Sequence, residues 1–86
     1  MSLGEIKSHL QTAHDAVEAA VGHSKAVGDQ HLKSAHVAVG AAMQAGLESD
    51  DIHQVAMELT QADAAVTELV EQLAAIMSRI SEVGSL

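Results

Sequence analysis

Apolar residues recur with a period of seven over the second half of the chain. Every a and d position of five consecutive heptads is apolar, a pattern typical of coiled-coil helices. Apolar residues at three e positions make this stripe wider than one neighbouring helix can cover. The pattern therefore predicts a helix over about 50–83 that packs against more than one neighbour. The a positions are Ile52, Leu59, Val66, Leu73 and Ile80, and the d positions are Val55, Ala62, Leu69, Ile76 and Val83.

A second apolar stripe with helical spacing runs through residues 3–43. Leu3, Val21 and Val39 are each 18 residues apart, which is five whole turns of an α-helix. The stripe predicts a nearly straight helix over about 3–45. Ser2 suits its N-cap, and Gly46 suits the left-handed residue that ends a helix. A turn over 46–49 would then make the two helices antiparallel.

These elements predict an all-α fold, an antiparallel two-helix hairpin that forms a single domain over residues 1–86. The chain has no aromatic residue, so the core of one hairpin is thin. We therefore expect the hairpin to dimerise into a four-helix bundle, chiefly through the second helix. The predicted dimer seam consists of Ile52, Val55, Leu59, Val66, Leu69, Leu73, Ile76 and Ile80.

The first helix contains an internal duplication. Residues 9–20 (HLQTAHDAVEAA) and 31–42 (HLKSAHVAVGAA) agree at eight of twelve positions. A shift of 22 residues is six turns plus about 40°, so both copies place their apolar residues on the same stripe, with histidines at its borders. Between the copies, Ser24, Gly28 and His31 form a polar layer. This layer either lines a cavity or sets the register, or a kink, of the bundle.

The net charge of −8 is uneven, with −1 on residues 1–47 and −7 on residues 48–86. A basic patch is missing, so neither nucleic acid nor an anionic membrane is an expected partner. In a hairpin that turns at residues 46–47, a residue of the first helix faces the residue of the second helix for which the two numbers sum to about 93. This register predicts a pH-sensitive pair of His31 with Asp63, and a more exposed pair of His36 with Glu58, because an imidazole forms an ion pair with a carboxylate only when it is protonated.

The histidines suggest a metal site, but their spacing argues against it. The repeated histidines are five residues apart and point to different sides of a helix, whereas metal pairs need a spacing of three or four. His14 with Glu18 has that spacing, as does Asp50 with His53, each without further partners. No triad or phosphate-binding motif is present. We therefore predict no catalytic residue, no metal site and no cofactor.

The chain resembles, in architecture and over its whole length, the Trp-x-Gly family of small secreted helical hairpins. At the place of that family's Trp-x-Gly turn, this chain has Gln44-Ala45-Gly46-Leu47. It also has no tyrosine, which the family's Tyr-x-x-x-acid export signal requires. The start MSLGEIKSHL is also similar to short actinobacterial proteins with alanine-rich helices. The family resemblance implies a dimer and export without a cleaved signal.

The sequence thus predicts a non-enzymatic structural or protein-interaction module, whose partner is a second copy or another helical protein. We expect a cytoplasmic location, because no signal-peptide pattern is present. The alternatives are an exported hairpin of the Trp-x-Gly type and a helical bundle that binds a small molecule or a metal.

Overall fold

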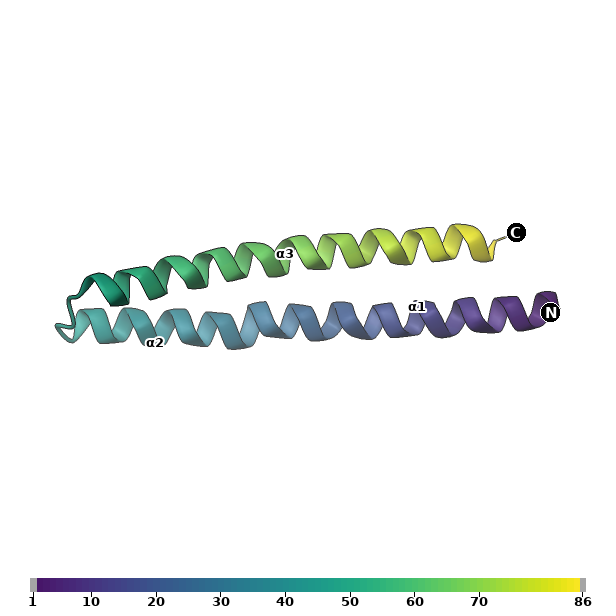
Figure 1. Cartoon of the computed structure of the whole chain (residues 1–86). Helices are drawn as coiled ribbons and strands as arrows, with labels where there is room; N and C mark the ends of the chain where they lie inside the picture. The colour runs from purple at the N-terminus through teal and green to yellow at the C-terminus, as the bar shows by residue number, and fades with distance from the viewer. Residues whose placement is uncertain (1, 86) are drawn as a thin grey trace.

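The computed structural model describes residues 2–85, which form long helices joined by one sharp turn (Figure 1). Helix α1 spans Leu3–Ala26, a π-helical segment η1 spans Val27–Leu32, and α2 spans Lys33–Gln44. These three segments follow one another without a break and are called helix one below. After the turn, α3 spans Asp50–Gly84. The described residues contain no strand, so the predicted all-α class is confirmed.

The turn is built from local hydrogen bonds that the sequence predicts. Gly46 has a φ angle of +108°, a conformation that side chains with a Cβ rarely adopt. The backbone N–H of Gly46 donates to the Met43 carbonyl, and that of Leu47 donates to the Ala42 carbonyl, both at 3.1 Å. This pair of bonds is a Schellman motif. It ends helix one and lets α3 run back alongside it in the opposite direction (Figure 1).

Both helices begin at a capping serine. The Ser2 hydroxyl accepts a hydrogen bond from the Glu5 N–H, and the Ser49 hydroxyl accepts one from the Ile52 N–H, each at 3.2 Å. These bonds satisfy backbone donors that have no partner inside the helix. The acids of the first turn of α3 also lie at the positive end of its dipole, so both starts are fixed by local chemistry.

The molecule is a thin rod of 65 × 15 × 15 Å. Its radius of gyration is 19.2 Å, whereas a compact domain of this length would have about 12 Å. Within residues 2–85 no side chain is fully buried, and the apolar contacts between helix one and α3 are at most half-buried. None of the described helices is long and apolar enough to cross a membrane.

The π-helical segment keeps the two ends of helix one facing α3. On the face toward α3, half-buried residues follow one another in alternating steps of four and three up to Gly28, and the next step, to Leu32, is four where three is due. Helix one therefore has one residue more than a strict heptad pattern at this point, and a π-turn is the way a helix takes up one extra residue. The face toward α3 includes Leu10, His14, Val17, Val21, Ser24, Gly28, Leu32, His36, Val39 and Met43.

The same segment explains the duplication and the polar layer. A repeat of 22 residues is three heptads plus one residue, and η1 absorbs that residue where the two copies meet. The single α-helix expected over about 3–45 is thus interrupted at Val27–Leu32. Ser24 and Gly28 are half-buried against α3, whereas His31 is exposed. Two of the three residues of the predicted polar layer therefore lie at the contact with α3, and His31 does not.

Candidate functional site

Helix α3 presents two apolar rows with different environments. The a residues and most e residues are half-buried against helix one. The d residues point away from that contact by about 80° on a helical wheel. Four of them remain exposed over 41–50% of their surface: Val55, Leu69, Ile76 and Val83. The packing of the helix pair therefore uses the a and e rows and leaves the d row open.

Helix one carries a matching row of small apolar residues. Each member lies three residues after an a-type position of helix one, as the d residues of α3 do after theirs. Ile6 and Val27 are exposed over 41% and 42% of their surface, respectively. The row consists of Ile6, Ala13, Ala20, Val27, Ala35 and Ala42.

The two rows lie on the same side of the helix pair. On each helix, the residues that directly follow the a-type positions point about 160° away from the d row. Gln11 of helix one and Ser81 of α3 line one shared groove, and Lys25 and Thr67 line another. These polar positions therefore occupy one side of the seam. The d row of α3 and the small-residue row of helix one share the other side, which we call the apolar face.

The predicted dimer seam is divided between these environments. Val55, Leu69 and Ile76 belong to the exposed apolar face. The other five residues are half-buried within the chain, against helix one. These five are Ile52, Leu59, Val66, Leu73 and Ile80. The a positions thus hold the helix pair together, while the d positions are free to contact another chain.

The structure does not bring His31 and Asp63 together. Among residues 2–85, the ion pairs within 4.0 Å both involve His14. Asp63 lines a groove on the polar side with Lys33 and His36. A π-turn takes more than four residues, so His31 falls almost directly above Val27, in the row of the apolar face. The extra residue of η1 therefore places the imidazole on the opposite side of the seam from the carboxylate.

His36 and Glu58 are not paired either. His36 is half-buried in the groove that Asp63 also lines. Glu58 is exposed, and its Oε1 accepts a hydrogen bond of 3.2 Å from Nε2 of Gln54, one turn earlier on α3. The chain therefore places the predicted second pair on separate surfaces.

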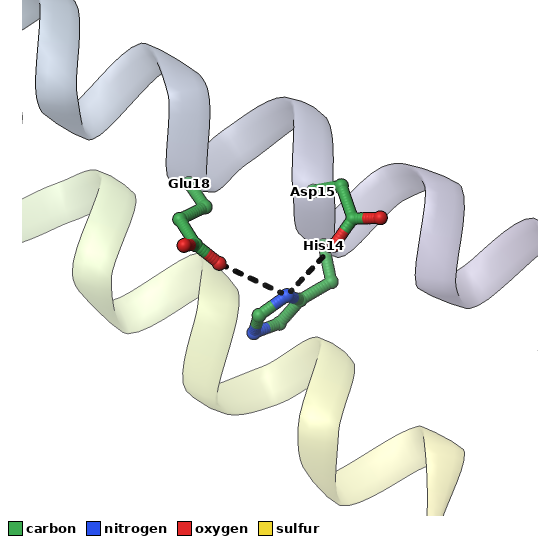
Figure 2. Close-up of side chains that lie close together, drawn as sticks. All are labelled: His14, Asp15 and Glu18. Atoms are coloured by element: carbon green, nitrogen blue, oxygen red, sulfur yellow. Dashed lines mark ion pairs between the residues drawn. The ribbon is translucent and has the colours of Figure 1, made fainter.

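One histidine does lie in a cluster of carboxylates (Figure 2). Nδ1 of His14 is 3.7 Å from Oδ1 of Asp15 and 3.8 Å from Oε2 of Glu18. The nitrogen is covered by protein atoms and has no hydrogen-bond partner.

The cluster offers three possible metal ligands on one helical turn. The ligand atoms of His14, Asp15 and Glu18 lie within 4.8 Å of one another. The carboxylate side chains are 64% and 65% exposed, and such open ion pairs contribute little stability. Sequence spacing identified His14 with Glu18 but missed Asp15, because adjacent helical residues seldom face each other. The signal was Gln11, whose Nε2 donates to Asp15 Oδ1 at 2.8 Å and holds that carboxylate near the histidine.

The described residues therefore offer an apolar face as a candidate site, and the His14 cluster as a small polar site on the opposite side of the seam. Comparison of the chain with protein-family models, with curated proteins and with solved structures found no match.

Proposed function

We propose that this chain is a non-enzymatic, self-associating interaction module. In this proposal the antiparallel hairpin pairs with a second copy through the apolar face, and the two hairpins form a four-helix bundle. The observation that supports it is the row of large apolar side chains left open on α3, next to an alanine-rich row on helix one. Exposed apolar patches of this kind mark interaction sites in proteins.

The size of the face suits a stable dimer. One broad side of a rod with these dimensions has an area on the order of 1,000 Å², and stable interfaces bury about 800 Å² on each partner. Alanines on helix one let the helices of the second copy approach closely, while the large d residues of α3 supply most of the buried apolar area. The chain lacks a buried residue of its own within 2–85, so a second copy would supply the missing core.

Thermal unfolding at several protein concentrations tests the proposal. Because dimerisation couples folding to concentration, a hundredfold increase should stabilise the folded state by about 2.7 kcal/mol. We expect the melting temperature, followed by circular dichroism, to rise by about 5–10 °C between 1 and 100 µM. A melting temperature that is constant over this range would overturn the proposal.

A further inference from the structure

The exposed row of α3 is symmetric about Leu69. Val55 lies fourteen residues before Leu69 and Val83 fourteen residues after it, and Ala62 and Ile76 lie seven residues to either side. When two identical helices pack antiparallel about a twofold axis at Leu69, each member of this row meets another member. Val55 then meets Val83 of the second copy, Ala62 meets Ile76, and Leu69 meets Leu69.

The row next to it carries charges with the same symmetry. Its members are the g positions Glu58, Ala65, Gln72 and Arg79. Arg79 is the only arginine of the chain, and both Arg79 and Glu58 are exposed. Neither takes part in an ion pair within 4.0 Å among residues 2–85. About the same axis, Glu58 of each copy lies beside Arg79 of the other, so the interface gains two opposite-charge pairs.

The remaining acids of α3 do not border this contact. Asp63 lines a groove on the polar side of the seam, beside Lys33 and His36. Asp50 and Asp51 lie in the first turn of the helix. Glu68, Glu71 and Glu82 occupy c and f positions, which point away from the apolar face. Their mutual repulsion across the dimer is screened over a Debye length of about 8 Å at physiological salt.

Helix one fits the same axis. Gly28 of helix one lies against Val66 of α3: a Cβ atom built on Gly28 would be 3.4 Å from Cγ1 of Val66. Because the two helices are antiparallel, Leu69, three residues after Val66, is level with about residue 25, three residues before Gly28. A twofold axis at that level brings Ala13 of each copy to within about one helical turn of Ala35 of the other. Alanine pairs let two helix axes approach closely, so helix one of each copy can lie beside helix one of the other.

We propose that the second copy covers the apolar face in the antiparallel orientation, with the two turns at opposite ends and α3 beside α3. This inference rests on the proposed function and adds the geometry and charge pairing of the interface. In the other twofold arrangement, with the turns at the same end, α3 lies beside helix one of the second copy. Glu58 and Arg79 then never meet.

Charge reversal tests the pairing. Glu58→Arg leaves two arginines at each end of an antiparallel dimer, and Arg79→Glu leaves two glutamates. Each variant alone should self-associate about tenfold more weakly than the unchanged chain. A mixture of the two should restore the unchanged affinity, because every contact in the mixed dimer again joins an arginine and a glutamate. Native mass spectrometry counts mixed and like dimers, and equal preference for both would overturn the orientation.

Disulfide trapping provides a second readout, since the chain has no cysteine. Mixing Val55→Cys with Val83→Cys under mild oxidation should give the mixed disulfide in preference to either like pair. With the turns at the same end, these residues are about 42 Å apart along the rod, and no mixed disulfide would form. A monomeric unchanged chain would overturn the proposed function itself, whereas a dimer without this disulfide would overturn only the antiparallel orientation.

Discussion

Replacing Leu69 by aspartate should dissociate the dimer without acting directly on the contact between helix one and α3. Leu69 is 43% exposed in the single chain, so the hairpin itself loses little when this side chain becomes polar. In the dimer the same position lies at the centre of the apolar face. An aspartate there would be an unpaired charge in an apolar contact, which costs several kcal/mol. We expect self-association to weaken at least a hundredfold.

Gln61→Asp is the matched control for this variant. It adds the same charge to the same helix, at an exposed c position that points away from both helix one and the apolar face. Its association should stay within about twofold of the unchanged chain, because surface substitutions cost little. Sedimentation velocity at micromolar concentration measures both variants. Equal association of Leu69→Asp and Gln61→Asp would place the interface elsewhere.

Deletion of one residue from η1 should be tolerated, whereas deletion of one residue from α3 should unfold the chain. Removing Asp29 takes away the residue that the π-turn accommodates. Helix one then becomes a continuous α-helix, whose half-buried residues keep steps of four and three along the whole length. The expected melting temperature lies within about 5 °C of that of the unchanged chain, because each residue on either side of the deletion still faces α3.

Deletion of Ala64 provides the comparison at the same level of the rod. Helix α3 has no extra residue, so removing one turns its two halves by about 100° relative to each other. About five half-buried apolar residues then lose their contact with helix one, at roughly 1 kcal/mol each. That loss is comparable to the whole stability of a small domain. Circular dichroism should show little helix for this variant, and similar melting of both deletions would contradict the role assigned to η1.

Local features of this fold could be predicted from the sequence because their causes are local. The serine caps, the glycine at the turn and the heptads of α3 each act within a few residues, and the elements begin and end close to the predicted positions. The capping hydrogen bonds at Ser2 and Ser49 need only the side chain and the next turn of backbone.

The division of the apolar rows could not be predicted in the same way. An a/d/e stripe shows that α3 has more than one neighbour, but it does not show which row faces helix one. That choice depends on the handedness and register of both helices together. The same limitation applies to His31 and Asp63, since the estimate of facing residues assumed a helix without the extra residue of η1. The length of the repeat indicates the extra residue, because 22 residues are three heptads plus one.

Sedimentation equilibrium of the unchanged chain, with helix content measured on the same samples, tests most directly whether a second copy completes the core. The mass of one chain is 8.9 kDa. We expect twice this mass at micromolar concentration, and a loss of helix on dilution as the dimer dissociates. A mass of 8.9 kDa with undiminished helix at every concentration would contradict it.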